Sequence, residues 1–546
     1  MRLVGDEDVK MKINVLIVLS IFVIIAISIA CFGAEVSEKQ DIAIFGLTYY
    51  NYSIPSEILG YIDSSISNVF INLKRFNVLG YGNYRIEEKD IDEFIERIRE
   101  IKAKEAYEAG TYDEKFGTVV IKGEDFEKIV NSFIVVIPTL SNYTPTVRRI
   151  EIETERGKSY IEQYNVELVI DITFIDVKRG VKAESIRISG SGTSTSFREA
   201  NKEAIDSAIS TLSYRIRQLE SFKIRSIIIE KRGDRVIFQP GKNFGIKPGD
   251  EYEVLIKKEL GRTGKIVEVP SGLIRVKKVF PEYSEGKLLI KKGDITEGDK
   301  LVEIAKLGIT IGFTGGFMQV DIPDMNYSII LVDDLYRYTE GTVLESLSNY
   351  YYIKLNQKER NYAPVFTLDI QKSLGYRFKG ILDISGVVNL PLFGILGEAG
   401  FGASFYKRRL SLTIQGEGGF LYMTTFRKPL YDYNLLFDTL LIGGEEIDYN
   451  KDPVASIYGT SVGLRGGVSL DFLFNHGFSL SFGANYRVYT PIKRWSILIE
   501  ETSGSNPSSV TIESDSPNVL ELPESEGMKM VRISGYELRC SLKLRF

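Results

Sequence analysis

Charged residues of both signs recur at every second position in parts of residues 305–546, with apolar residues between them. In a β-strand this spacing places the charges on one face and the apolar residues on the other. Acids and bases confined to a narrow interior have to form ion pairs, because an unpaired buried charge is costly. The sequence therefore predicts an internal salt-bridge network of Glu398, Glu417, Arg465, Asp471, Arg487, Glu537 and Arg539, with Asp369, Asp383, Lys543 and Arg545 on the same face.

Few residues are of the types that catalyse reactions or bind metals. The one histidine, His476, lies in the short segment FNHGF with no evident Ser or Cys partner, and Cys31 and Cys540 cannot complete a Cys/His zinc site. The segment GSGTSTS (189–195) lacks the lysine of a phosphate-binding loop. We expect no catalytic residue, no cofactor-binding residue and no metal ligand, and hence a protein that is not an enzyme.

Composition limits the class of protein further. The 546 residues are 44% hydrophobic and 26% charged, which argues against a disordered chain and a helical membrane protein. A net charge of −5 gives no electrostatic reason to bind nucleic acid. The 31 Tyr and 30 Phe residues, against one Trp, suit strands whose rings lie at an interface.

Residues 1–34 have the order of a secretory signal peptide. Two lysines precede the apolar run 13–30, and CFGAEVSEK follows it. A permanent transmembrane helix is the alternative, because the run of 18 residues reaches the lower limit for a span. Translation from Met11 and lipid attachment at Cys31 also stay open.

Two further domains are predicted before residue 305. Residues 35–222 alternate between strand patterns, such as DIAIFGL, and helical spacing, as in PSEILGYIDSSISNVFINLKRF, which predicts an α/β domain. Residues 223–304 are short β-runs separated by QPGKNFGIKPGD, ELGRTG, VPSG and KKGDITEGD, which predicts a small SH3-like β-barrel.

These two segments resemble known periplasmic domains. The opening strand and helix, RFNVLGY and GSGTSTSFREANKEAIDSAI resemble the curli-secretion (CsgG-type) and TolB amino-terminal α/β domains. RVIFQPGKNFGIKPGDEYEVL, GLIRVKKVFPEYSEGKLL and ITEGDKLV resemble the carboxy-terminal SH3-like barrel of the flagellar-assembly protein FlgT. The resemblance, over 41–303, implies non-enzymatic assembly or interaction modules.

Residues 305–546 contain eight segments with a period of two, which begin near 307, 366, 382, 393, 410, 461, 478 and 534. The long connections 321–363, 426–455 and 490–530 all follow odd-numbered segments, as in outer-membrane barrels. We therefore predict an eight-stranded antiparallel transmembrane β-barrel that resembles the OmpA/OmpX type. Trp495, Tyr486, Tyr489 and Lys493 are expected at its outer aromatic rim.

The chain ends YELRCSLKLRF. Its alternating apolar residues and final aromatic residue resemble the carboxy-terminal signal by which outer-membrane proteins are recognised for insertion. The expected signal residues are Tyr536, Leu542, Leu544 and Phe546. Because eight strands leave room for little more than side chains, we expect a closed interior and not a pore.

Together these features predict a multidomain α+β and all-β protein of the bacterial outer membrane, with amino-terminal domains in the periplasm. Its expected role is to anchor a periplasmic assembly or interaction module. The expected partners are outer-membrane lipid, the barrel-assembly machinery and a periplasmic protein. The alternatives are a subunit of a CsgG-like secretion assembly, or a surface adhesin or receptor that acts through the long loops.

Overall fold

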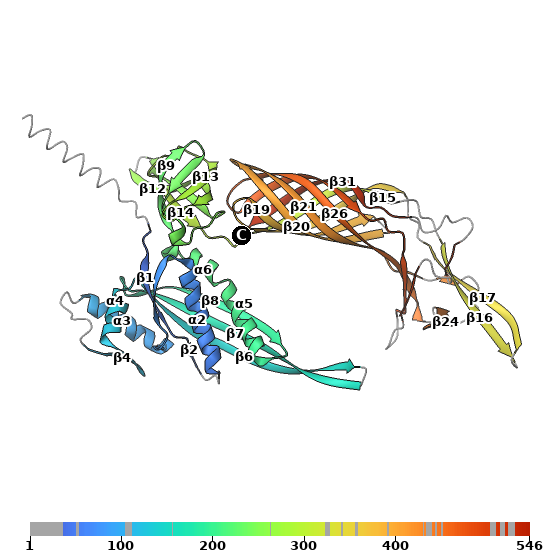
Figure 1. The fold of residues 1–546 in the computed structure, drawn as a ribbon, viewed down its shortest axis with the longest axis horizontal. Coiled ribbons are helices and arrows are strands. Elements are labelled where there is room, and N and C mark those ends of the chain that lie inside the picture. Colours follow the sequence, from blue (N-terminus) through green and yellow to red (C-terminus); the bar gives the residue numbers. More distant parts are fainter. Residues whose placement is uncertain are drawn as a thin grey trace, which may run out of the picture. The chain divides into compact units, whose positions relative to one another are not determined.

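The computed structural model divides the chain into two compact units, residues 1–305 and 306–546, which are treated separately below (Figure 1). The expected signal peptide (1–34), with Cys31, lies outside the described residues. Among the residues that are described, no helix is long and apolar enough to cross a lipid bilayer. The structure describes residues 37–50, 54–103, 112–154, 157–261, 264–322, 328–339, 342–354, 359–389, 392–429, 431–432, 439–442, 445–448, 451–502, 509–513, 519–521 and 530–546.

A mixed β-sheet with the order β3-β1-β6-β7-β8 forms the centre of the first unit. Strand β1 is parallel to β3 and β6, and the β6–β7 and β7–β8 pairs are antiparallel. The short β2 pairs with β6, and β4 and β5 form a separate hairpin. The bounds are β1 Gln40–Phe45, β2 Thr48–Tyr49, β3 Phe76–Tyr81, β4 Glu114–Phe116, β5 Val119–Ile121, β6 Ile134–Thr154, β7 Gly157–Asp176 and β8 Val181–Ser194.

Helices cover both faces of this sheet, and strand β1 is apolar on both sides. On β1, Ile42 and Ile44 pack with α2 (Ser56–Leu73), α5 (Phe197–Ser210) and α6 (Leu212–Gln218). Ala43 and Phe45 pack on the opposite face with α3 (Ile91–Ala103) and α4 (Gly123–Asn131). The result is a sheet enclosed between two layers of helix (Figure 1).

The hairpin of β6 and β7 is longer than the sheet to which it belongs. The two strands pair from Ile134–Asp176 to Thr154–Gly157, whereas β8 pairs with β7 only from Tyr164 onward. The far end of the hairpin is therefore a two-stranded ribbon that extends beyond the sheet (Figure 1).

Residues 225–304 form a closed six-stranded barrel with the order β10-β13-β12-β11-β14-β9. Turn-rich sequence between short apolar runs predicts such a compact β-structure, and the SH3-like relationship stays a prediction. The bounds are β9 Arg225–Arg232, β10 Arg235–Phe238, β11 Glu251–Leu260, β12 Lys265–Val279, β13 Ser284–Lys291 and β14 Lys300–Ile304. Within the described part of the first unit, 3-10 helices are formed by Glu88–Asp90, Glu220–Phe222 and Lys242–Phe244.

Glu303, on β14, ties this small barrel to the α/β sheet. Its buried carboxylate accepts hydrogen bonds from Arg75 Nη1 at 2.7 Å and Arg217 Nε at 2.6 Å, and from the backbone N–H of Ile224 at 3.1 Å. Phe222, in the linking segment, packs its ring edge-to-face against Phe76. The two arginines and the carboxylate are largely buried, so these ion pairs form mostly out of contact with water.

The second unit is built on a closed antiparallel barrel of eight strands, which confirms the predicted strand number. Each strand pairs with its neighbour in the chain, β21 pairs with β26, and the last strand pairs with the first. The bounds are β15 Ile309–Ile322, β18 Arg360–Ser373, β19 Phe378–Asn389, β20 Leu392–Lys407, β21 Leu410–Thr425, β26 Val454–Leu473, β27 Phe478–Tyr489 and β31 Ser534–Arg545.

The three long connections contain strands of their own, which sequence alternation did not identify. One four-stranded sheet, β23-β17-β16-β30, takes strands from all three connections. Strand β28 pairs with β26 and so lengthens the barrel wall on one side. The bounds are β16 Ser328–Thr339, β17 Thr342–Lys354, β22 Lys428–Pro429, β23 Tyr431–Asp432, β24 Thr439–Ile442, β25 Glu445–Asp448, β28 Ser496–Glu500, β29 Ser509–Glu513 and β30 Val519–Glu521.

Candidate functional site in the barrel interior

Alternation along the eight strands gives the barrel an apolar outer surface and a polar interior. On β15, Phe313 and Phe317 point outward and are 59% and 66% exposed, whereas Thr314 between them is buried. The same outward exposure is found for Phe366, Leu382, Phe401, Leu412, Leu464, Phe482 and Leu538, which represent the other seven strands. A soluble barrel has the opposite arrangement, with its apolar residues inside.

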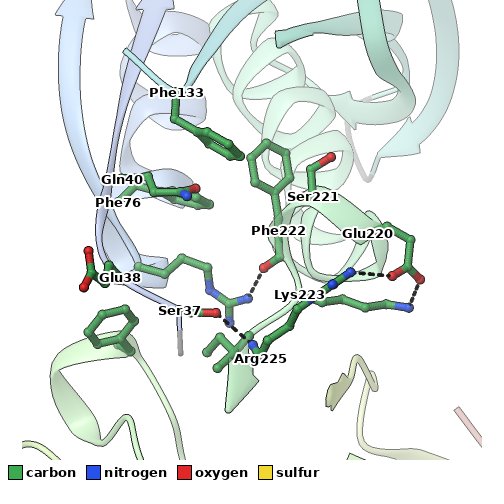
Figure 2. A pocket seen from close by; sticks show the side chains of 13 residues that line it. Ser37, Glu38, Gln40, Phe76, Phe133, Glu220, Ser221, Phe222, Lys223 and Arg225 are labelled. Atoms are coloured by element: carbon green, nitrogen blue, oxygen red, sulfur yellow. Dashed lines mark hydrogen bonds and ion pairs between the residues drawn. The ribbon is translucent and has the colours of Figure 1, made fainter. Parts of the chain in front are cut away.

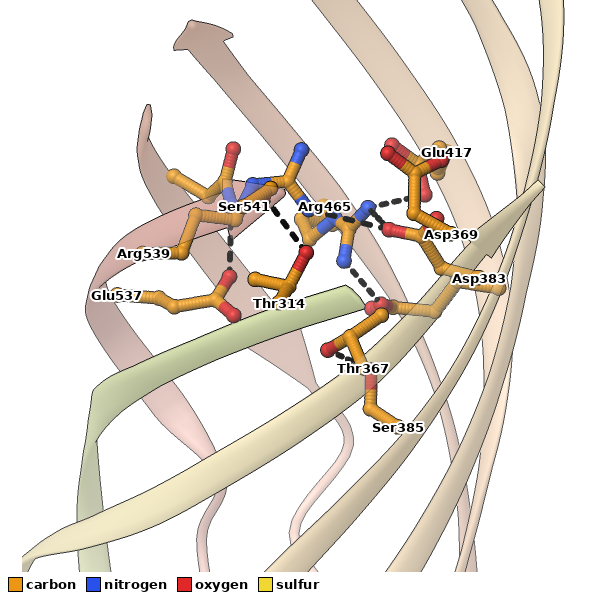
Figure 3. A network of polar contacts seen from close by, with 12 residues as sticks. Thr314, Thr367, Asp369, Asp383, Ser385, Glu417, Arg465, Glu537, Arg539 and Ser541 are labelled. Atoms are coloured by element: carbon orange, nitrogen blue, oxygen red, sulfur yellow. Dashed lines mark hydrogen bonds and ion pairs between the residues drawn. The ribbon is translucent and has the colours of Figure 1, made fainter. Parts of the chain in front are cut away.

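Arg465, on β26, is the centre of the interior charge network (Figure 3). Its Nη1 lies 2.7 Å from Glu398 Oε2 and its Nη2 lies 2.5 Å from Glu417 Oε2. The same Nη2 donates to Asp383. All four side chains are at most 1% exposed, so these ion pairs form out of contact with water.

Arg487, on β27, links Glu398 to a further acid, Glu537. It pairs with Glu398 and lies 3.4 Å from Glu537, whose other oxygen accepts a 2.7 Å hydrogen bond from Asn485 Nδ2. Tyr489 donates its hydroxyl to Glu398 at 2.9 Å. Glu398 therefore accepts hydrogen bonds from two arginines and one tyrosine.

Two more pairs extend the network along the barrel. Arg539 Nη1 lies 3.1 Å from Asp383 Oδ2, and Lys543 Nζ lies 2.7 Å from Asp471 Oδ1. The structure thus places every residue of the expected network in an ion pair inside the barrel. Arg545 donates to the backbone carbonyl of His476.

Most of the acids and most of the bases come from different walls. Asp369, Asp383, Glu398 and Glu417 lie on the consecutive strands β18 to β21, whereas Arg465, Arg487, Arg539 and Lys543 lie on β26, β27 and β31, together with the acids Asp471 and Glu537. The pairs that Asp383 and Glu398 form with these arginines therefore cross the interior, whereas Glu417 and Arg465 are direct neighbours on adjacent strands. Such cross-links fill the interior and hold the closed barrel together.

Sequence reasoning missed two contributors. Lys379 Nζ donates to Gln371 Oε1 at 2.7 Å, but Lys379 was not among the residues expected to face the interior. Tyr489 was expected at the outer rim, yet it is 2% exposed and bonded to Glu398. Its position on the inward face of β27, two residues after Arg487, was the available signal.

Trp495 was also expected at the outer rim, but this prediction is wrong because its side chain is fully buried. It belongs to an apolar cluster that occupies the other end of the barrel interior and includes residues from the long connections. Tyr486 does face outward, at 48% exposure. The members of the cluster include Met318, Val320, Val365, Val387, Leu396, Leu421, Ile447, Ile457, Ile492, Trp495, Ile497 and Val531.

Glycines on the inner face make room for these large side chains. A Cβ atom on Gly419 would lie 2.6 Å from Glu398 Cγ and 2.8 Å from the Tyr489 hydroxyl. A Cβ atom on Gly463 would lie 2.5 Å from the Tyr489 ring. The small residues that alternation places inside the barrel are thus required by the ion-paired interior.

Asp383, Glu398 and Glu417 each offer an oxygen within 4.8 Å of the others, the spacing of a possible metal site. Arg465 donates to all three, however. The protein itself therefore supplies the positive charge that these carboxylates require.

The expected insertion-signal residues share the outer face of β31 and its end. Tyr536, Leu542, Leu544 and Phe546 are 70%, 46%, 39% and 45% exposed. The backbone of Phe546 closes the seam with β15: its N–H donates to the Ile309 carbonyl at 2.8 Å, and its carbonyl accepts from the Gly308 N–H at 2.9 Å.

The first unit contains a pocket of about 600 Å³ between the α/β sheet and the small barrel (Figure 2). Phe76, Phe133 and Phe222 supply aromatic surface, and Arg75 donates to the Phe222 carbonyl at 2.9 Å. Lys223 is already paired with Glu220. No Ser–His or Cys–His pair is found among the described residues that line this pocket.

No protein-family model matches the chain, and no curated protein matches it. Among solved structures, a major outer membrane protein from Thermus thermophilus aligns at 10% identity and a TM-score of 0.22, covering 44% of this chain and 99% of its own. OprG from Pseudomonas aeruginosa aligns at 14% identity and a TM-score of 0.21, covering 44% and 97%. OmpT of Vibrio cholerae aligns at 9% identity and a TM-score of 0.12, covering 76% and 98%. With TM-scores this low, the argument for function rests on the barrel's own surface and interior.

Proposed function

We propose that this chain is an outer-membrane β-barrel protein whose closed barrel anchors the first unit in the periplasm as a non-enzymatic assembly or interaction module. The observation that carries the proposal is the apolar outer surface around an ion-paired interior. In water such a surface would be unfavourable by roughly 25 cal/mol per Å² of apolar area. In lipid it is the expected exterior.

The dimensions of the barrel support a membrane location. Its strands are 12 to 20 residues long, whereas a tilted strand needs about 9–11 residues to cross the hydrocarbon core. A closed eight-stranded barrel also leaves no unpaired strand edge in lipid.

The interior supports an anchoring role over a conducting one. Charges that cross the interior and the apolar cluster beyond them leave little space for water. We therefore expect purified protein in a planar bilayer to show no steady ion conductance. Large, reproducible conductance steps would contradict the closed interior, and recovery of the protein in a soluble fraction would contradict the membrane location.

The proposed module role needs a partner in the periplasm. A pull-down with residues 35–305 is expected to retain an envelope protein, and the same fragment with Glu303→Gln tests whether the intact junction is required. The native mass in detergent separates this proposal from a CsgG-like secretion assembly, since a monomer excludes a ring of subunits.

A surface role is the second candidate, and one observation favours it. The sheet β23-β17-β16-β30 joins all three long connections into a single structure. Removal of residues 328–354, which contain β16 and β17, would disrupt that sheet without removing a barrel strand. If cells that carry this variant bind less well to a surface or ligand than cells that carry the wild-type protein, an adhesin or receptor role is supported.

A further inference from the structure

Asp369, on β18, differs from the other buried acids of the barrel interior. Asp383, Glu398, Glu417 and Glu537 each lie within 3.4 Å of an arginine nitrogen. Asp369 is 1% exposed but has no such cation among the described residues. Its Oδ2 accepts a 2.6 Å hydrogen bond from Gln371 Nε2. Its Oδ1 is buried and accepts no hydrogen bond from the described residues.

The neighbour of Asp369 is another carboxyl group. Asp369 and Asp383 are direct cross-strand partners on β18 and β19, both are buried on the inward face, and the Cβ atoms of directly opposite residues lie about 4.5–5.5 Å apart. Two ionised carboxylates have no proton to share and repel each other. Asp383 also accepts from Arg465 and Arg539, so it is the member of the pair that is ionised.

We propose that Asp369 is a neutral carboxylic acid that donates a hydrogen bond to Asp383, so that the barrel interior contains a built-in proton-binding site. Among the described residues of the interior, the proton removes a buried charge that has no ion-pair partner. The buried charged residues on the described barrel strands are five acids and four bases, and one bound proton makes this set neutral: Asp369, Asp383, Glu398, Glu417 and Glu537 against Arg465, Arg487, Arg539 and Lys543. Counting the less buried Asp471 and Lys379 as well adds one charge of each sign and leaves the excess unchanged.

The surroundings favour a proton over a metal ion. A Cβ atom on Gly312 would lie 3.3 Å from both Asp369 Oδ2 and Lys543 Cγ, so β15 and β31 pack closely against this carboxyl group. Every cation that faces the pair already has a partner: Lys543 holds Asp471, Arg539 and Arg465 hold Asp383, and Lys379 donates to Gln371. A proton needs no further space.

Infrared spectroscopy of the full chain in lipid vesicles tests this proposal, with carbon-13 in the aspartate carboxyl groups so that their bands can be distinguished. At neutral pH, we expect a protonated-carboxyl C=O band that shifts in D₂O. It should be lost in Asp369→Asn, whose amide can donate to Asp383 in place of the acid. It should persist in Asp471→Asn, which removes a carboxylate that is paired with Lys543.

Absence of a protonated aspartate band in the wild-type protein would overturn the proposal, and so would its persistence in Asp369→Asn. A band that appears only when sodium is removed would also overturn it, because a metal ion would then be the natural occupant. The wild-type spectrum alone is decisive if the variant does not fold. The outcome is independent of the conductance and partner tests, since it concerns protonation inside the barrel only.

Discussion

Arg487 and Glu398 form a two-point ion pair inside the barrel, with Nε 3.0 Å from Oε1 and Nη2 2.8 Å from Oε2. Such paired contacts fix the orientation of both groups as well as their separation. The third nitrogen of Arg487 lies towards Glu537. One side chain on β27 thus joins β20 to β31 across the interior.

Replacing this arginine should weaken the barrel. In Arg487→Met, Glu398 keeps Arg465, but Glu537 loses its cation and becomes an uncompensated buried charge, which costs on the order of 3–5 kcal/mol. Urea unfolding in detergent, followed by the mobility shift between folded and unfolded barrel on gels, measures the change. Arg427→Met is the control, because its pair with Glu500 is exposed to solvent, and an equal loss of stability there would contradict the role of the interior network.

The inward glycines should tolerate a methyl group far less well than the outward ones. Gly419→Ala places a Cβ atom against Glu398 and Tyr489, and overpacking of this kind costs about 1–3 kcal/mol. Gly416→Ala, three residues earlier on β21, meets no atom within 4 Å. We expect a lower unfolding midpoint in urea for the first variant alone; equal midpoints would show that the interior can rearrange.

Much of the barrel could be predicted from sequence because the alternation of inward and outward residues depends only on neighbours within one strand. A period of two decides which residues face inward, and this rule holds for Phe313, Thr314 and the residues that follow them. The same rule places Tyr489 and Lys379 on the inward faces of β27 and β19, but it was not applied at these strand ends. The aromatic type of Tyr489 indicated a rim position instead, and Lys379 was not assigned to the interior.

Partner choice inside the barrel could not be predicted, because it depends on the stagger between strands that are distant in the chain. Arg465 is 82 residues from Asp383, to which it donates. The sheet formed by the three long connections could not be predicted for the same reason. It also depends on pairing between strands that are distant in the chain, since β30 pairs with β16 across nearly the whole barrel sequence. Alternation within one segment holds no information about either contact.

The junction at Glu303 should respond to acid. Burial acts to raise the pKa of Glu303, but the charges of Arg75 and Arg217 outweigh burial and lower this pKa below its ordinary value. The carboxylate therefore stabilises the folded junction at neutral pH, and its contribution is lost as the pH falls through the folded-state pKa.

Glu303→Gln removes the same contribution at neutral pH and leaves two arginines without their shared carboxylate, at a cost of about 3 kcal/mol. Hydrogen exchange of the full chain should show faster exchange in β14 and in the segment around Phe222. Glu268→Gln, whose pair with Lys300 is partly exposed, is expected to exchange like the wild type. Unchanged protection in Glu303→Gln would show that the apolar contacts of Phe222 hold the junction without the ion pairs.

The terminal Phe546 is expected to act in membrane assembly through its side chain, although its backbone also closes the seam between β31 and β15. Deletion of Phe546 removes both contributions, because the hydrogen bonds to Ile309 and Gly308 are lost with the residue. Phe546→Ala keeps those backbone bonds and removes only the exposed ring. If the ring is part of an insertion signal, both variants should accumulate less folded barrel in the membrane, and Phe546→Tyr should assemble normally. Normal assembly of Phe546→Ala together with failure of the deletion would assign the requirement to seam closure instead, since backbone pairing with the first strand is the one feature that separates the two variants.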